Sequence, residues 1–376
     1  MGSCNISIIG LILFNIIYSS YTEDSTFSQE NRSEHLLIPA NVNGQRLYTY
    51  YENDSTVITS PEPGYQDCKI PGIIPSNHRH ELGNGKMVAF TPIYTHFSIL
   101  DFKNCSSYTP IHINDGKPYY YDSQLEIHAV IPHYNTFDVY NLRNRACNPC
   151  RYNDKGERLQ VDNILMPETD KASKYFLEPI TNISGVSNGY LNGISFRAND
   201  STTLRVLDSN YNIVKERSLD GQYLDSSTTH GNVTVCTSIN TCPDSFFDCL
   251  APRCQLLDSN LNTIANVGVQ QPKGNPMFVY VHIKNLKDGG AMISMEFGYY
   301  DLLNGDSRQD IFIQQINANG KVEPVIRLGR FDAEYVSFHH YMLKSEEYCA
   351  VLSLEKKEDK DYSLIKCVIP KTPRKD

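Results

Sequence analysis

Residues 207–214 read LDSNYNIV, and residues 257–264 repeat this segment almost unchanged as LDSNLNTI. In both copies an apolar strand end leads into a turn rich in Asp and Asn, and a second apolar segment follows. Asp and Asn suit tight turns because their short side chains bond to nearby backbone groups and tolerate left-handed conformations. Each copy therefore predicts a β-hairpin.

Looser copies of this hairpin occur as YNDKGERL at residues 152–159 and INANGKV at residues 316–322, with a more distant one, INDG, at residues 113–116. The positions taken as equivalent are Asn153, Asp208, Asp258 and Asn317. The intervals between them are 55, 50 and 59 residues, from 153 to 208, from 208 to 258 and from 258 to 317. A period near fifty residues is typical of one four-stranded sheet per repeat.

Strand-like segments precede the hairpins. YLNGISFRA at residues 190–198 precedes residues 203–207, while MFVYVHI at residues 277–283 and AMISMEF at residues 291–297 precede residues 310–316. The chain has 25 Tyr, and apolar stripes of helical period are scarce. Tyr and β-branched side chains favour pleated, half-buried surfaces, so the sequence predicts an all-β fold.

At the level of these repeats the chain resembles the β-propeller repeat proteins, over about residues 86–370. The resemblance implies a propeller-like array of four-stranded repeats of roughly 50–60 residues. Residues 288–290, DGG, are similar to the double glycine of kelch repeats, whereas the WD dipeptide is absent. One or two β-sandwiches with hairpins of similar composition are the alternative.

The chain begins with features of a signal peptide. Residues 6–17 read ISIIGLILFNII, an apolar run that is too short for an ordinary transmembrane helix. No Lys or Arg precedes this run, and a buried N-terminal helix or strand is the alternative. No later segment has the length and apolarity to cross a membrane. The expected division is a signal peptide at 1–20, a polar spacer and loop-rich segment at 21–85, and the β-repeat domain at 86–376.

Ten cysteines follow the expected signal peptide, and an even number can pair completely in an oxidising compartment. They are Cys68, Cys105, Cys147, Cys150, Cys236, Cys242, Cys249, Cys254, Cys349 and Cys367. Cys147 and Cys150 have the spacing of a redox motif, but they stand just before a hairpin, so structural disulfides are favoured. The four cysteines at 236–254 lack the paired spacing of zinc knuckles, so two disulfides are favoured over a zinc site.

One disulfide can be predicted from strand register. YCAVLSL at residues 348–354 and YSLIKCV at residues 362–368 flank a charged turn. If the turn centres on Glu358, Cys349 lies directly opposite Cys367, close enough to form a disulfide.

Acceptor sequences for N-glycosylation support an extracellular location. They begin at Asn31, Asn53, Asn104, Asn182, Asn199 and Asn232. Asn199 and Asn232 are the most favoured because they fall in polar stretches beside strands. Together with the leader and the cysteines, these sequences predict a secreted glycoprotein that begins near Tyr21.

Charge limits the classes of partner. The formal net charge is −9 and the isoelectric point is near 5.7. A nucleic-acid surface needs a basic footprint, so we expect no nucleic-acid partner.

Metal-binding patterns are weak. Residues 208–212 and 258–262 match the opening D-x-N-x-N of a calcium loop but lack the later Gly and Glu, so a turn is favoured. His78-x-His80 and His339-His340 lack a third placed ligand. We therefore expect neither a metal nor another cofactor.

No nucleophile, zinc-protease, Walker or dinucleotide motif is present. The sequence therefore favours a secreted module that binds an extracellular protein or glycan through loops of the β-repeats, without turnover. The alternative is a glycan-active hydrolase with dispersed carboxylates, which the sequence cannot single out among 43 Asp and Glu. The lack of Trp, the side chain that often stacks on sugar rings, argues against this alternative. The expected binding loop is residues 220–253, with Phe246 and Phe247 as anchors or, alternatively, as plugs of a local apolar gap.

Overall fold

The structure is a computed structural model of the whole chain. It describes residues 27–33, 38–39, 47–60, 64–72, 78–90, 96–107, 111–112, 127–141, 150–159, 174–180, 183–196, 201–229, 231–240, 250–267, 276, 278–300, 307–331, 335–342, 347–355 and 362–370. In these residues no helix has the length and apolarity needed to span a bilayer.

The described strands form seven sheets, which we call blades 1 to 7 in chain order. Blade 1 contains β2 (Ile38–Pro39), β3 (Tyr48–Glu52), β4 (Ser55–Thr59) and β5 (Cys68–Pro71). Blade 2 contains β6 (His78–Glu81), β7 (Met87–Phe90), β8 (His96–Asp101), β9 (Ser106–Ser107) and β10 (Ile111–His112). Blade 3 contains β11 (Ile127–Pro132), β12 (Thr136–Asn141), β13 (Cys150–Asn153) and β14 (Arg158–Leu159).

The other four blades complete the set. Blade 4 contains β15 (Lys174–Ile180), β16 (Gly189–Phe196), β17 (Ser201–Asp208) and β18 (Ile213–Asp220). Blade 5 contains β19 (Gln222–Thr229), β20 (Asn232–Asn240), β21 (Leu250–Leu257) and β22 (Thr263–Val267). Blade 6 contains β23 (Phe278–Asn285), β24 (Ala291–Tyr300), β25 (Ser307–Ile316) and β26 (Ile326–Phe331). Blade 7 contains β27 (Tyr335–Met342), β28 (Tyr348–Glu355), β29 (Tyr362–Val368) and β1 (Phe27–Ser33).

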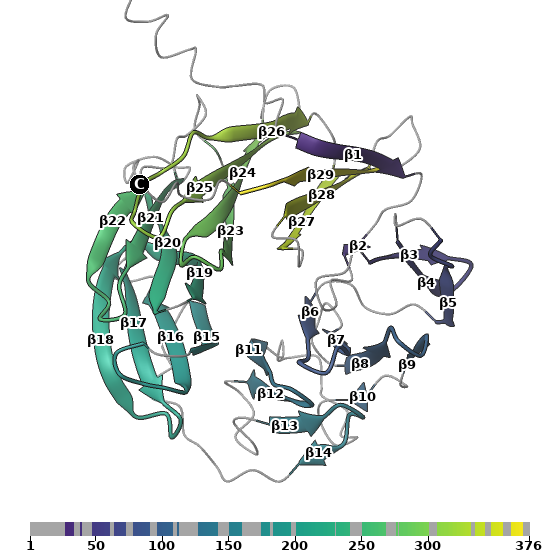
Figure 1. Cartoon of the computed structure of the whole chain (residues 1–376), viewed down its shortest axis with the longest axis horizontal. Coiled ribbons are helices and arrows are strands. Elements are labelled where there is room, and N and C mark those ends of the chain that lie inside the picture. The colour runs from purple at the N-terminus through teal and green to yellow at the C-terminus, as the bar shows by residue number, and fades with distance from the viewer. Residues whose placement is uncertain are drawn as a thin grey trace, which may run out of the picture.

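The blades stand in a ring, with the first strand of each blade toward the centre (Figure 1). All the strand pairs within the blades are antiparallel. The last sheet is completed from the beginning of the chain, because β1 pairs with β29, Phe27 opposite Val368 and Ser33 opposite Ser363. The chain is therefore a seven-bladed β-propeller whose ring is closed by its N-terminal strand.

The apolar core lies between the blades. In β20, Val233 and Val235 pack with blade 4, whereas Cys236 packs with blade 6 on the opposite face. Side chains alternate between the two faces of a strand, so a sheet held between two neighbours needs apolar residues on both. This requirement explains why apolar residues occupy both faces of β24, where Met292 packs toward blade 7 and Ile293 toward blade 5.

The all-β propeller prediction is confirmed, and the β-sandwich alternative is wrong. The structure corrects two boundaries. Residues 21–85, predicted as a spacer and a loop-rich segment, contain β1, all of blade 1 and β6. Their strands are short, so the Pro and Gly clusters between them read as a loop, although they mark closely spaced turns.

Residues 220–253, predicted as a long insertion between repeats, hold β19, β20 and the start of β21. They therefore form most of a regular blade. Residues on the two faces of β19 do alternate as in a strand. The hydroxyl-bearing residues of DSSTT at 225–229, however, give this strand the composition of a polar loop.

The repeated turns are the third connections of their blades, and they share one hydrogen-bond pattern. In blade 4 the Asp208 carboxylate accepts bonds from the backbone N–H of Asn210 and of Asn212, each at 2.8 Å. In blade 5 the Asp258 carboxylate accepts the same two bonds, at 2.8 and 2.7 Å. The fourth residue of each turn has a positive φ, 64° at Tyr211 and 61° at Leu261. The carboxylates satisfy their own turns, which supports the turn interpretation over the calcium one.

This arrangement can be tested at Asp258. Asp258→Ala should lower the free energy of unfolding by about 1 kcal/mol, because it removes the acceptor of these bonds. Asp258→Asn should have a smaller effect, since Asn153 accepts the equivalent bonds from Lys155 and Glu157 in blade 3. Chemical denaturation with and without calcium measures both effects. A calcium-dependent stabilisation that Asp258→Asn abolishes would contradict the turn interpretation.

Three disulfides lie wholly within the described residues. Cys349–Cys367 and Cys236–Cys254 each join neighbouring strands of one blade, and each encloses 18 residues. Cys349 lies opposite Cys367, which is the register expected from the sequence. Cys68–Cys105 instead joins blade 1 to the turn after β8 in blade 2. Cys150 is also disulfide-bonded, whereas Cys147, Cys242 and Cys249 lie outside the described residues.

The Cys349–Cys367 bond gives a stability prediction. Replacing both residues with Ala should lower the free energy of unfolding by about 3 kcal/mol, because a loop of this length loses a closure constraint in the unfolded chain. Urea denaturation of the oxidised wild type and the double variant measures the difference. A non-reducing digest that joins either cysteine to another partner would contradict the register.

Candidate functional site

Polar side chains from the innermost strands of blades 4 to 7, with one from a neighbouring strand, form a belt beside the axis of the ring. We call this set the polar belt; its members are Glu178, Tyr223, Asp225, Ser226, His282, Lys284, His340 and Tyr348. Glu178 comes from β15, the next three from β19, the next two from β23, His340 from β27 and Tyr348 from the neighbouring β28. Figure 1 shows β15, β19, β23 and β27 following one another around the inside of the ring.

The first part of the belt joins blades 4 and 5. The Ser226 hydroxyl donates to Glu178 Oε1 at 3.4 Å. The Tyr223 hydroxyl donates to Ser226 Oγ at 3.2 Å. Tyr223 and Ser226 are buried, so these two hydroxyls hold the Glu178 carboxyl group against β19.

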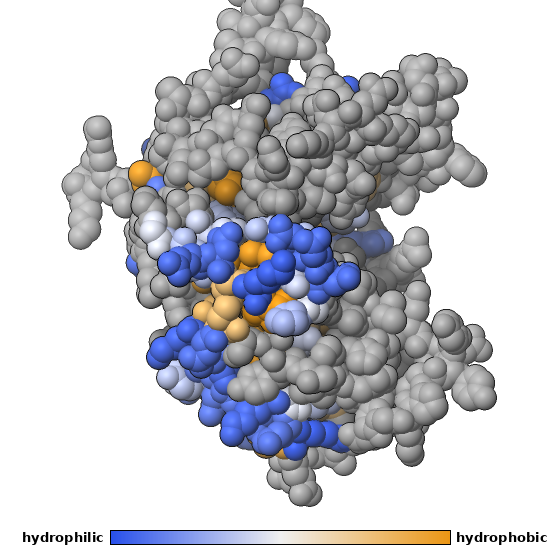
Figure 2. Space-filling model, turned by 90° about the vertical axis from the view of Figure 1, so that its right-hand side faces the viewer, coloured by the Kyte–Doolittle hydropathy of each residue, from blue (hydrophilic) through white to orange (hydrophobic). Residues whose placement is uncertain are grey.

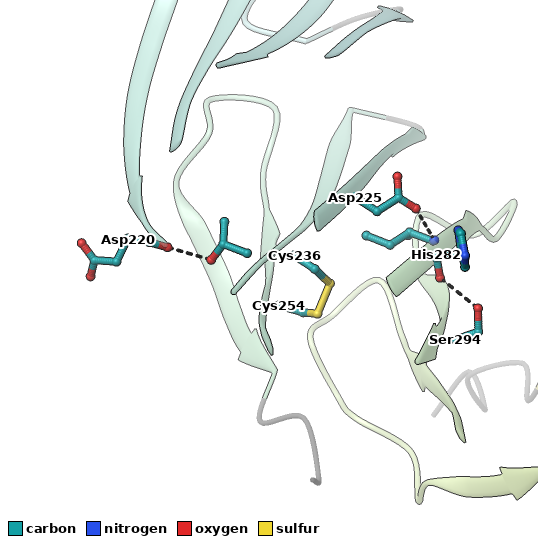
Figure 3. Close-up of a disulfide and its surroundings, with 8 residues drawn as sticks. Asp220, Asp225, Cys236, Cys254, His282 and Ser294 are labelled. Carbon is teal, nitrogen blue, oxygen red and sulfur yellow. Dashed lines mark hydrogen bonds between the residues drawn. A yellow bond between two sulfur atoms is a disulfide. The ribbon is translucent and has the colours of Figure 1, made fainter. Parts of the chain in front are cut away.

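The second part joins blades 5 and 6. The backbone N–H of Ile283 donates to Asp225 Oδ2 at 2.7 Å, and Figure 3 shows Asp225 reaching across to this strand. The β19 ladder shifts register between Tyr223 and Asp225, and this bulge changes the direction of the following side chains. Lys284, the next residue of β23, is close enough to favour the ionised forms of both Glu178 and Asp225.

The third part joins blades 6 and 7. The rings of His282 and His340 lie 4.8 Å apart between centroids. His340 Nδ1 and the Tyr348 hydroxyl are 3.0 Å apart, at hydrogen-bond distance. Burial lowers the pKa of His282 to about 4, and the nearby Lys284 acts in the same direction, so this imidazole is neutral at pH 7.

The two carboxyl groups differ in charge at neutral pH. Burial raises the pKa of Glu178 to about 8, and repulsion from Asp225 adds to the shift. Burial also raises the pKa of Asp225 to about 6, against the bond from Ile283 and the attraction of Lys284. At pH 7 Glu178 therefore carries a proton while most of Asp225 is ionised, a division suited to an acid and a base.

These groups are enclosed without being sealed. Protein surrounds both carboxyl groups closely enough to desolvate them, yet Glu178, Asp225, His282 and Lys284 all keep part of their surface accessible to water. A ligand can reach the belt through these accessible parts, and the same contact with water reduces the desolvation of the two carboxyl groups. A polar ligand can therefore contact donors and acceptors that have already lost part of their hydration.

The residues predicted to bind a partner, Phe246 and Phe247, lie outside the described residues and stay a prediction. Of the glycosylation acceptors, Asn53 and Asn104 are exposed at turns, and Asn31 lies within β1. Asn232 is half-buried, and its side-chain amide donates to the Gly289 carbonyl at 3.1 Å. Two further acceptors also lie outside the described residues, Asn182 and Asn199.

Metal ligands do not gather in the described part of the chain: no group of three or more His, Cys, Asp or Glu is placed to hold an ion. The Cys236–Cys254 disulfide excludes a zinc site made of the four cysteines at 236–254. His80 packs edge-on against Phe90, with ring centroids 6.0 Å apart.

Figure 2 shows the side of the ring that carries β3, β4 and β5. The described residues on this face are mainly hydrophilic and enclose a small apolar area. Large apolar patches are typical of protein-binding surfaces, so the described part of this face gives less indication of a ligand site than the polar belt does.

No motif in the sequence predicts the polar belt. Its carboxylates are two among 43 Asp and Glu, and the contributions of successive blades are more than forty positions apart. A usable signal is an ionisable residue within an expected central strand, as in YVHIK at residues 280–284. That signal can be read only when the central strand of each blade is known, and the central strand of blade 5 lies in residues 220–253, which the sequence predicts as a loop.

No protein-family model matches the chain, and no curated protein matches it. Among solved structures it is similar to Hsv2 of Kluyveromyces lactis, with a TM-score of 0.39, 11% identity, and coverage of 79% of this chain and 99% of that one. It is also similar to the Dos1 propeller, with a TM-score of 0.42, 10% identity, and coverage of 88% and 96%. An endo-arabinase of Bacteroides thetaiotaomicron gives a TM-score of 0.35, 12% identity, and coverage of 63% and 90%. At these values the likenesses say nothing about the function of this chain.

The raised pKa of Glu178 predicts a pH dependence of stability. Between the usual Glu pKa near 4.3 and the folded value of about 8, only the folded state holds this proton, so stability should fall as pH rises. The contribution of Glu178 cannot exceed about 1.4 kcal/mol per pH unit. Glu178→Gln should therefore give a shallower decline than the wild type. Denaturation curves from pH 5 to pH 8 measure both, and equal slopes would contradict the assignment.

Proposed function

We propose that this propeller is a secreted binding protein and that the polar belt binds a hydroxyl-rich glycan. The observation that carries the proposal is the convergence of donors and acceptors from four successive blades on one partly accessible surface. Asp225 accepts, Lys284 donates, and the protonated Glu178 can do both. Sugars present alternating donors and acceptors, so a mixed set of this kind suits them better than an apolar ligand.

The extracellular location is part of the same proposal. It is supported by the apolar leader, by the disulfides and by glycosylation acceptors at exposed turns such as Asn53. An intracellular compartment would keep such thiols reduced.

A second candidate is glycan hydrolysis, which the division of charge between the two carboxyl groups favours. The protonated Glu178 would donate its proton to the leaving oxygen, while the ionised Asp225 would act as base or nucleophile. The two functions use the same residues and differ in whether a bond is cleaved.

Binding and cleavage can be separated by two variants. Asp225→Asn keeps an acceptor for Ile283 but removes the charge, so it should weaken glycan binding on an array about tenfold or more. Because this change also creates an N-x-S acceptor sequence at position 225, the wild type and all variants are produced in a host that forms disulfides but attaches no N-glycans. Glu178→Gln imitates the protonated acid, so it should weaken binding less and abolish any cleavage. Asp67→Asn is the matched control, because it removes an exposed carboxylate directly before β5 of blade 1 and creates no acceptor sequence.

The outcomes divide clearly. Binding without product release by the wild type supports the binding protein. Release of sugar that Glu178→Gln abolishes supports the hydrolase. Equal glycan binding by the wild type and Asp225→Asn would contradict a role for the polar belt in either glycan binding or glycan hydrolysis.

A further inference from the structure

A small polar groove lies between blades 4 and 5, away from the central strands. Its volume is about 180 Å³, below the range of cavities that enclose a drug-sized molecule, so it suits one charged group or one sugar ring. The residues that line it are Arg217, Ser218, Leu219, Asp220, Val235, Thr237, Arg253 and Gln255. The first four belong to β18, the outermost strand of blade 4, and the others to β20 and β21 of blade 5.

A disulfide cross-links the strands of blade 5 that form one wall of the groove. Val235 lies opposite Gln255, and Thr237 lies opposite Arg253. The Cys236–Cys254 pair falls between these two pairs and faces blade 6 on the other side of the sheet. The disulfide, which Figure 3 shows, therefore links the two strands on the face opposite the groove. A rigid wall lowers the entropy lost on binding.

Arg217 is held in place across the boundary of the two blades. Its guanidinium donates to the Leu261 carbonyl and, at 2.6 Å, to Thr263 Oγ1, both in blade 5. A guanidinium has five N–H donors, so these two bonds leave further donors for a ligand.

Arg253 supplies a second positive charge. It is exposed, and no described residue forms a hydrogen bond or ion pair with it. Asp220 also lines the groove, but Figure 3 shows its carboxylate pointing away from the disulfide, while its backbone carbonyl accepts a bond from Thr237 at 2.7 Å. The groove is therefore lined by two arginines and one aspartate, in a chain whose net charge is −9.

Gln255 adds an acceptor to the same groove. Its side-chain nitrogen donates to Asn266 at 2.9 Å, whereas its Oε1 is buried without a hydrogen-bond partner among the described residues. A buried acceptor of this kind is stabilised when a ligand brings a donor. A free oxyanion has none, but a sugar hydroxyl does.

We propose that this groove binds a sulfated or phosphorylated glycan. The oxyanion lies between Arg253 and Arg217, where planar guanidinium groups match its oxygen atoms. A hydroxyl of the sugar ring donates to Gln255. None of the residues that line the groove belongs to the polar belt, so this inference does not depend on the polar belt.

The test uses the full-length oxidised protein and titration calorimetry with a heparin-derived hexasaccharide, the same hexasaccharide after desulfation, and inorganic sulfate. The wild type should bind the sulfated hexasaccharide and not the desulfated one. Arg253→Gln should weaken this binding about tenfold, because it removes a charge-assisted bond from an exposed side chain. Lys155→Gln is the matched control: it removes one exposed charge in blade 3 and should leave binding unchanged.

Four results would overturn the proposal. They are equal binding by Arg253→Gln and the wild type, equal loss in Lys155→Gln, equal binding of the desulfated hexasaccharide, and binding of inorganic sulfate alone. The first three would show that no specific oxyanion site exists in the groove. The last would assign the site to a free anion in place of a glycan. Circular dichroism of the Arg253 variant separates lost binding from lost folding.

Discussion

The pairing of β1 with β29 closes the ring, and every interface between blades depends on this closure. Each blade buries both faces against its neighbours, so an open ring would leave two apolar faces in water. Tyr48 of blade 1 packs in one cluster with Tyr341, Val351 and Cys367 of blade 7, at the point where the two ends of the chain meet. By completing blade 7, the distant strand β1 therefore stabilises the contacts between blade 7 and blade 1.

Closure also explains where polar chemistry can collect. The strands nearest the axis approach one another from four blades, so side chains far apart in sequence become neighbours across β15, β19 and β23. The protein positions Asp225 by a bond to the backbone of the next blade, which makes the site a property of the assembled ring. The groove between blades 4 and 5 is assembled in the same way, since Arg217 is anchored on a blade to which it does not belong.

The sequence could predict the features that are local. The turns at Asp208 and Asp258 use neighbouring groups only, and the Cys349–Cys367 register follows from the length of one hairpin. Blade 1 was missed because its strands are short, and blade 5 because its first strand is rich in hydroxyl groups. The polar belt could not be predicted, because its residues meet only through the ring, which no local pattern records.

The same closure has a mechanical consequence. Since β1 and β29 are antiparallel, Phe27 and Val368 lie at the same end of the pair. A force that draws these two points apart would load the hydrogen bonds between the strands one after another, as in a zipper, and not all together in shear. Cys349–Cys367 ties β29 to β28, so the peeling would release β1 and leave the hairpin of blade 7 whole. Under such a force the ring would therefore open first at its N-terminal strand, while the disulfide-linked strands of blade 7 would stay paired.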